Sequence, residues 1–176
     1  TFRDQPVKLN LSKAVELLVW LALNGAASRD RIVDALWDGS NDQRHLDYFR
    51  VAVKRLREGL TAACGYSASP VLFEHGQYAL ADHVHVDLDL NCLRRALEDR
   101  EPAQLLGALA LCRGDFAPEF YAEWAEEVRF KARDMAVTVA LALGAQSEHH
   151  DPKQAMNAYR SCLLYPSPTP RDPSTL

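Results

Sequence analysis

Residues 42–60 read DQRHLDYFRVAVKRLREGL, and this stretch decides the fold expected for the first half of the chain. Apolar side chains recur in it at alternating spacings of three and four, the period at which they share one face of an α-helix. The stretch therefore predicts a long helix. Its buried stripe would be formed by Leu46, Phe49, Val53, Leu56 and Leu60.

The opposite face of this helix supplies candidate binding residues. At about 100° per residue, Arg44, Tyr48, Val51 and Arg55 lie away from the apolar stripe, and other cations flank them. Cations neutralise phosphates and guanidinium groups pair with base edges, so this face suits a helix that enters a DNA groove. A solvated surface helix is the alternative reading. The candidates are Arg44, Tyr48, Arg50, Val51, Lys54, Arg55 and Arg57.

Shorter elements are predicted before the long helix. Two extended pieces, at residues 1–2 and 7–9, precede a helix that Ser12 would cap and Asn24-Gly25 would end. Ser28 would cap a second helix. Its buried side is expected to consist of Ile32, Val33, Leu36 and Trp37. Three helices separated by tight turns are typical of a helix-turn-helix core.

A hairpin is predicted directly after a loop at residues 61–69. Residues 71–80, VLFEHGQYAL, read as two strands around a turn in which Gly76 provides the positive φ. A hairpin that follows the third helix of such a core is a wing, and this favours the groove-reading interpretation of the long helix. His75 and Gln77 would lie on the wing.

From residue 86 onward the pattern is almost entirely helical. Asp89 would cap a helix at 90–99, Pro102 would lie in the first turn of a helix at 103–112, and Pro152 would open a helix at 153–164. A long amphipathic helix is expected at 119–144. Small residues such as Gly107 indicate closely packed helix pairs, as in tetratricopeptide arrays. The aromatic residues expected to be mostly core are Phe116, Phe120, Tyr121, Trp124 and Phe130.

Composition limits the class of protein. The 176 residues carry a net charge of −4, which argues against a chain coated in positive charge and makes any nucleic-acid contact local. The four cysteines form no CxxC pair, and no apolar run is long enough to span a membrane, so we expect a cytoplasmic protein.

Catalytic motifs are not evident in the sequence, so we expect no enzyme and no cofactor. His83, His85 and Asp87 would share one face of a strand and could ligate zinc. A polar edge of the second domain is the favoured alternative for these three residues, and His149-His150-Asp151 is expected to be an ordinary loop between helices. A metal-dependent enzyme using His83, His85 and Asp87 is thus a minor rival reading.

Several segments together resemble a known family. LSKAVELLVWLALNGAASRDRIVDALW, RVAVKRLREGL and VLFEHGQYALA look like the winged-helix DNA-binding domain of the OmpR/PhoB type. VDLDLNCLRRAL, ALCRGDFAPEFYAEWAEEVRFKARD and AMNAYRSCLLYP look like the bacterial transcriptional activator domain. In this order the two modules resemble regulators of the Streptomyces antibiotic regulatory protein group.

This resemblance implies a mainly α protein with a small β component. A winged helix-turn-helix domain would occupy residues 1–82, with a shortened N-terminal sheet, and a tetratricopeptide-like domain residues 83–165, followed by a flexible tail at 166–176. The implied function is transcription regulation, expected to be activation, by binding direct repeats in promoter DNA.

The resemblance also implies roles for residues and partners. Arg44, Tyr48, Val51, Lys54 and Arg55 would enter the major groove, Arg50 and Arg57 would contact phosphates, and His75 and Gln77 would approach the minor groove. The helical domain would mediate self-association, as in a homodimer, or contact RNA polymerase. The alternative is a protein-interaction module of a larger signalling or ATPase-coupled regulator that does not bind DNA directly.

Overall fold

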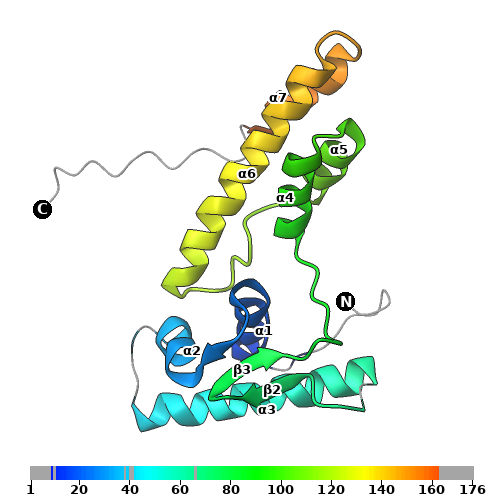
Figure 1. The fold of residues 1–176 in the computed structure, drawn as a ribbon. Coiled ribbons are helices and arrows are strands. Elements are labelled where there is room, and N and C mark those ends of the chain that lie inside the picture. The colour runs from blue at the N-terminus through cyan, green and yellow to red at the C-terminus, as the bar shows by residue number, and fades with distance from the viewer. Residues whose placement is uncertain (1–8, 10, 38, 40–41, 66, 163–176) are drawn as a thin grey trace, which may run out of the picture. The chain divides into compact units, whose positions relative to one another are not determined.

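The computed structural model describes residues 9, 11–37, 39, 42–65 and 67–162 (Figure 1). Its described part is mainly helical with a small β component, as the sequence predicts, and the β component is one three-stranded sheet. The chain forms two compact units, one built from Thr1–Val86 and Phe120–Trp124 and the other from Asp87–Glu119 and Ala125–Leu176. The extended pieces expected at 1–2 and 7–9, except for Leu9, lie outside the described residues, as does the tail at 166–176.

The first unit contains three helices and the sheet. The helices are α1 (Ser12–Asn24), α2 (Arg29–Leu36) and α3 (Gln43–Cys64), and the strands are β1 (Ala27–Ser28), β2 (Val71–Glu74) and β3 (Gln77–Leu80). All pairings are antiparallel, with β3 between β1 and β2. The two-residue strand β1 was not predicted, because a strand this short has no periodicity to detect.

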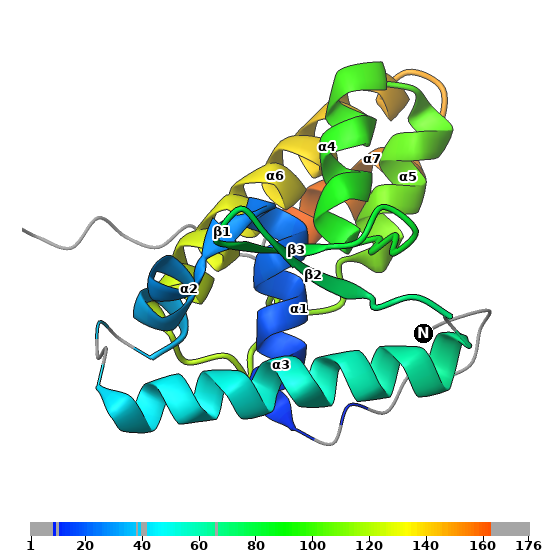
Figure 2. The same ribbon diagram turned by 60° about the horizontal axis from the view of Figure 1, so that its bottom comes forward.

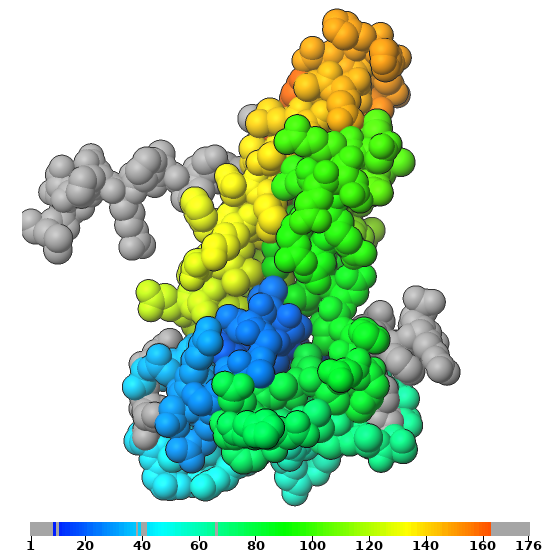
Figure 3. All heavy atoms as spheres, in the orientation of Figure 1, coloured from blue at the N-terminus to red at the C-terminus, as the bar shows by residue number. Residues whose placement is uncertain are grey.

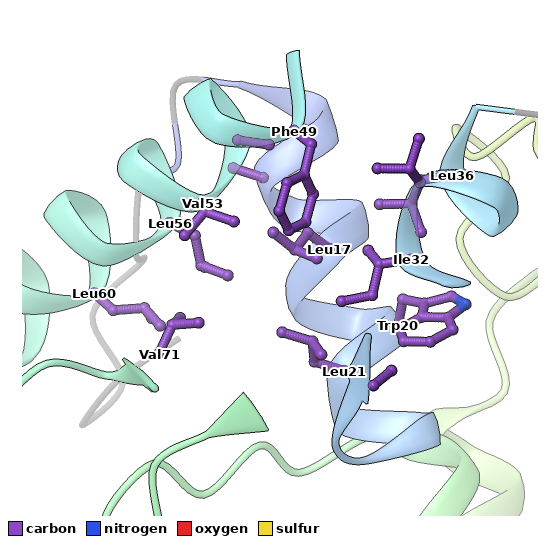
Figure 4. Close-up of a cluster of buried hydrophobic side chains, with 14 residues drawn as sticks. Leu17, Trp20, Leu21, Ile32, Leu36, Phe49, Val53, Leu56, Leu60 and Val71 are labelled. Carbon is purple, nitrogen blue, oxygen red and sulfur yellow. The ribbon is translucent and has the colours of Figure 1, made fainter. Parts of the chain in front are cut away.

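The core of the first unit lies where α1 crosses α3 (Figure 2). Phe49 of α3 points toward Leu17 of α1, and Ile32 and Leu36 of α2 close the cluster from the other side (Figure 4). The predicted stripe of α3 is buried at four of its five positions, and Leu46 is half-buried. Ile32, Val33 and Leu36 are buried as expected, whereas Trp37 is half-buried.

The helix boundaries agree with the expected signals at some ends and not at others. Ser28 caps α2 by accepting a hydrogen bond from the Arg31 backbone N–H, and α1 ends at Asn24 before Gly25. The prediction that Ser12 caps α1 is wrong, because Ser12 is the first helical residue and Leu11 is the N-cap. Leu11 is half-buried and packs against the core, and it forms no side-chain cap hydrogen bond.

The long helix extends further than the sequence pattern indicates. Residues 61–64, expected in a loop, continue α3 to Cys64, and the helix ends where Gly65 adopts a left-handed φ of 67°. Thr61, Ala62 and Ala63 lie beyond the apolar stripe but tolerate a helix. The following hairpin is confirmed, with His75 and Gly76 both at positive φ in its two-residue turn.

The second unit consists of helices. They are α4 (Asp89–Asp99), α5 (Pro102–Leu111), α6 (Glu123–Ser147), whose first two residues are grouped with the first unit, and α7 (Pro152–Cys162). Their shared core includes Leu93, Leu105, Val139, Leu143 and Ala158. Close helix packing is required at Gly144, where an added Cβ would lie 2.3 Å from a ring carbon of Tyr159.

Two predictions for this unit need correction. Asp89 does not cap α4, because it is already helical and Leu88 is the N-cap. The helix expected at 119–144 begins at Glu123, since residues 112–122 form a loop held by side chains of α6. The last two residues of the helix expected at 153–164 lie outside the described residues, and α7 is described as far as Cys162.

The loop between α5 and α6 is fixed by two arginines. Arg129 is 5% exposed and donates hydrogen bonds to the carbonyl oxygens of Phe116 and Ala117, the latter at 2.7 Å. Arg133 forms a bidentate pair with Asp115, at 2.8 and 2.6 Å. Bidentate pairs of this kind fix geometry as well as charge, so the loop has a defined course.

The expected aromatic core is only partly present. Phe120 is buried and Phe116 and Trp124 are half-buried, but Tyr121 is 91% exposed and Phe130 is 54% exposed. Tyr121 lies between the buried residues Phe120 and Ala122 but points to solvent, and Phe130 faces away from the helical core. The core prediction is therefore wrong for these two rings.

Candidate nucleic-acid interface

The outward face of α3 is exposed to solvent with respect to the described residues. The side chains of α3 form the lower surface of the first unit in Figure 3. The exposed candidates on this helix are Arg44, Tyr48, Arg50, Val51, Lys54 and Arg55. Asp42 caps the helix through a 2.9 Å hydrogen bond from the His45 backbone N–H, which lowers the pKa of the Asp42 carboxyl from its usual value. The cap fixes where the helix begins and therefore which residues face outward.

Arg44 and Tyr48 form one unit near the start of this face. The Nε atom of Arg44 donates a 2.7 Å hydrogen bond to the Tyr48 hydroxyl oxygen, and the guanidinium carbon lies 5.4 Å from the centre of the Tyr48 ring. The hydrogen bond raises the pKa of Arg44, so the guanidinium is charged at any physiological pH. In this arrangement the η nitrogens of Arg44 can still donate to a ligand.

Two acids lie among the cations of α3. Asp47 accepts a 2.6 Å hydrogen bond from Arg50, and Glu58 lies 3.2 Å from Arg55 and 3.8 Å from Lys54. All of these side chains are exposed, so each ion pair is weak and screened by salt. Four exposed cations against two acids leave α3 with a local positive charge that the whole chain does not have.

Arg57 contacts the hairpin. It is half-buried, and its Nε atom donates a 3.0 Å hydrogen bond to the carbonyl oxygen of Val71, the first residue of β2. The hairpin lies along α3 (Figure 2), and His75 and Gln77 are exposed at its turn and at the start of β3. Arg57 therefore differs from the other cations of α3, because the structure gives it a contact that positions the hairpin.

An aromatic chain on the hairpin was missed by the sequence reasoning. Phe73 is 56% exposed, and its ring centre lies 4.6 Å from that of Tyr78, which in turn lies 4.9 Å from Phe49 in the core. Cross-strand pairing of Phe73 with Tyr78 could have indicated this, since the two residues oppose each other in the predicted hairpin. Phe73 and Val51 are large apolar side chains exposed on the hairpin and on α3.

The other candidate residues are placed elsewhere. His83, His85 and Asp87 do not lie on a strand, and Asp87 pairs with Arg95 at 3.2 Å. Within the described part of the chain, His, Cys, Asp and Glu side chains form no group of three that could hold a metal ion. His149 and His150 lie in the turn between α6 and α7, as expected.

Comparison with known proteins does not identify a relative. No protein-family model matches the chain, and no curated protein sequence matches it. Among the helices that the structure describes, none combines the length and the apolar character needed to cross a membrane. The case for a function therefore rests on the geometry of α3 and the hairpin.

Proposed function

We propose that this chain is a sequence-specific DNA-binding transcription regulator, in which the first unit is a winged helix of the OmpR/PhoB type. The observation that carries the proposal is the outward face of α3, where exposed cations surround Val51 on the side opposite the buried stripe. A capped helix of 22 residues with such a face has the length and the donors to contact base edges and phosphates in a major groove.

The hairpin supports this reading. It follows α3 directly and is tied to it by Arg57, so a groove-bound α3 would bring His75 and Gln77 to the neighbouring backbone or minor groove. In this proposal Arg44, Tyr48, Val51, Lys54 and Arg55 contact the major groove, and Arg50 contacts phosphates. Arg57 contributes mainly by holding the hairpin, although its η nitrogens can reach a phosphate.

The second unit is proposed to serve protein contacts. Close helix packing at Gly144 and the buried small residues Ala108 and Ala158 support a tetratricopeptide-like arrangement for it. By resemblance to the bacterial transcriptional activator domain, this unit would mediate self-association or contact RNA polymerase, and the whole chain would activate transcription from direct repeats. No cofactor, metal or catalytic step forms part of the proposal.

A protein-interaction module is the second candidate. It is favoured by Asp47 and Glu58, which pair with three of the cations on α3 and give this face mixed charge. A protein surface with both charges could engage such a face, whereas phosphates would be repelled by the two acids. Salt-dependent binding to duplex DNA separates the two candidates, because only the DNA-binding regulator is expected to show it.

The deciding experiment is selection of bound sites from a random duplex pool, followed by titration of the enriched sequence at several salt concentrations. DNA reading predicts an enriched direct repeat, with log K falling by about 0.9 per log unit of salt for each phosphate neutralised. If no sequence is enriched while circular dichroism shows an intact helical fold, the DNA-binding proposal fails and the protein-interaction candidate replaces it.

A further inference from the structure

Residues Phe120–Trp124 belong to the first unit, although Asp87–Glu119, which separate them from Val86 in the sequence, belong to the second unit. Phe120 and Ala122 are 3% and 4% exposed, and the intervening Tyr121 points to solvent. The ring centres of Phe120 and Trp124 lie 5.9 Å apart, and Trp124 packs against the core of the first unit. The alternation of buried and exposed residues shows that this segment buries one side.

Trp124 has a specific polar partner in the first unit. Its indole Nε1 donates a 3.2 Å hydrogen bond to Oε1 of Glu16, a residue of α1 that is only 4% exposed. A carboxylate is costly to bury unless each oxygen finds a donor or a countercharge. The second oxygen, Oε2, lies 2.8 Å from Nζ of Lys13. Each carboxylate oxygen of Glu16 therefore has a partner, Trp124 for Oε1 and Lys13 for Oε2.

Lys13 continues this connection to α2. Its Nζ donates a hydrogen bond to the carbonyl oxygen of Leu36, the last residue of α2, and lies 5.3 Å from the ring centre of Trp37. The last carbonyls of a helix have no partner within the helix, and a cation there is also favoured by the helix dipole. The ammonium group of Lys13 thus closes the carboxyl end of α2, directly before the turn that leads to α3.

We propose that Trp124 is a positioning residue for the carboxyl end of α2 and acts on it through Glu16 and Lys13, with residues 120–124 serving as an intramolecular ligand of the first unit. Without the indole N–H, Oε1 of Glu16 has to draw its hydrogen bond from water. The carboxylate then moves outward, Lys13 follows its countercharge, and the carbonyl of Leu36 loses its donor. This role needs no DNA, so it stands or falls independently of the proposed function.

Amide hydrogen exchange in the full chain, followed by NMR, tests the proposal. The reporters are the backbone N–H groups of Trp37 and Gly39, which donate to Val33 and Asp34 at 3.0 Å at the end of α2. Trp124→Phe keeps an aromatic ring but removes the donor. Since a hydrogen bond to a buried charge is lost, we expect exchange at Trp37 and Gly39 to accelerate by about tenfold, with the core amides of α3 unchanged.

A second variant separates the effect of the hydrogen bond between Trp124 and Glu16 from that of the ion pair between Glu16 and Lys13. Glu16→Gln keeps an acceptor for Trp124 but removes the countercharge of Lys13. We expect it to accelerate exchange at Trp37 and Gly39 as Trp124→Phe does, while the chemical shift of the Trp124 indole N–H stays close to its wild-type value. Tyr121→Ala is the matched control, because Tyr121 lies in the same segment but is exposed, and it should change neither reporter.

Two results would overturn the proposal. One is unchanged exchange at Trp37 and Gly39 in both Trp124→Phe and Glu16→Gln. The other is uniform acceleration across all amides of the first unit, which would mean that Trp124 adds only general stability. Glu16→Gln preserves the shape of the buried side chain, so it provides a folded test even if Trp124→Phe does not fold.

Discussion

The Nε atom of Arg57 on α3 lies 3.0 Å from the carbonyl oxygen of Val71, the first residue of β2. This hydrogen bond joins the predicted groove-reading helix to the hairpin that follows it, in addition to the ring contact between Phe49 and Tyr78. The same carbonyl also accepts a 2.8 Å hydrogen bond from the Ser69 hydroxyl. Removing Arg57 would therefore weaken the attachment without leaving the carbonyl entirely unpaired.

Replacing Arg57 by methionine tests this attachment. The side chain keeps its apolar stem but loses the donor, so we expect the free energy of unfolding of the first unit to fall by about 1 kcal/mol. Arg50→Met is the matched control, since Arg50 is exposed and bonded to Asp47, and it should cost no more than about 0.5 kcal/mol. Urea denaturation measures both. Equal losses in the two variants would contradict a special role for Arg57.

Alanine variants on α3 test the proposed DNA contacts. If Arg55 reads a base, Arg55→Ala should cost about 1–3 kcal/mol of affinity for the selected site and relax specificity at one position, whereas Lys54→Ala should weaken all duplexes alike. Fluorescence anisotropy with selected and scrambled duplexes measures both effects. Lys131→Ala, which removes a cation paired with Glu127 in the second unit, is the control. Wild-type affinity in both α3 variants would refute this assignment of the helix.

Removing an acid of α3 should raise the affinity for duplex DNA, whereas removing a cation should lower it. Glu58→Gln removes the countercharge of Lys54 and Arg55 and a source of repulsion toward phosphates, so we expect duplex affinity to rise by about threefold to tenfold. The matched control is Glu127→Gln on α6, where an acid pairs with a lysine in the same i,i+4 spacing. A loss of affinity in Glu58→Gln would show instead that Glu58 contacts the partner directly.

Two glycines provide a test of helix packing in the second unit. Gly144→Ala would place a methyl group 2.3 Å from the Tyr159 ring and should lower the free energy of unfolding by about 1–3 kcal/mol. Gly107→Ala, in the middle of α5 with nothing within 4 Å of the added Cβ, should raise it by up to about 1 kcal/mol. Thermal denaturation compares the two, and a stabilising Gly144→Ala would mean that Tyr159 swings away at little cost.

The pair of Asp115 and Arg133 predicts a pH dependence. The hydrogen bond from Arg133 lowers the pKa of Asp115, so its stabilising effect is complete above the ordinary aspartate pKa of 3.8 and is lost as the pH falls through the lowered value. Both side chains are partly exposed, which limits the contribution to about 0.5–1 kcal/mol.

Asp115→Asn should therefore be less stable than wild type near pH 7, and the difference should shrink as the pH falls below 3.8. Urea denaturation at several pH values, monitored by circular dichroism, measures this difference. Asp134→Asn is the control, because Asp134 is an exposed acid on the same helix as Arg133. A stability difference that stays constant between pH 7 and pH 2.5 would contradict the assigned cause.

Helix ends and turns were predictable from the sequence where a single residue type determines them. Ser28, Gly25 and Pro102 mark helix ends as expected, and Gly76 marks the hairpin turn. The predictions for Ser12 and Asp89 failed because the half-buried residues Leu11 and Leu88 are the N-caps of these helices and no side-chain cap forms. A capping residue signals only that a helix end is close, because the first helical residue can lie one or two positions from the place that the signal indicates.

The candidate site shows the same division. The period of residues 42–60 determined by itself that Arg44, Tyr48, Val51 and Arg55 would face away from the core, because helical geometry fixes which side chains share a face. Tertiary structure alone decided that Arg57 turns to the hairpin and that Trp124 reaches Glu16 across 108 positions of sequence. Periodicity carries information over one element, whereas contacts between elements depend on how their surfaces pack.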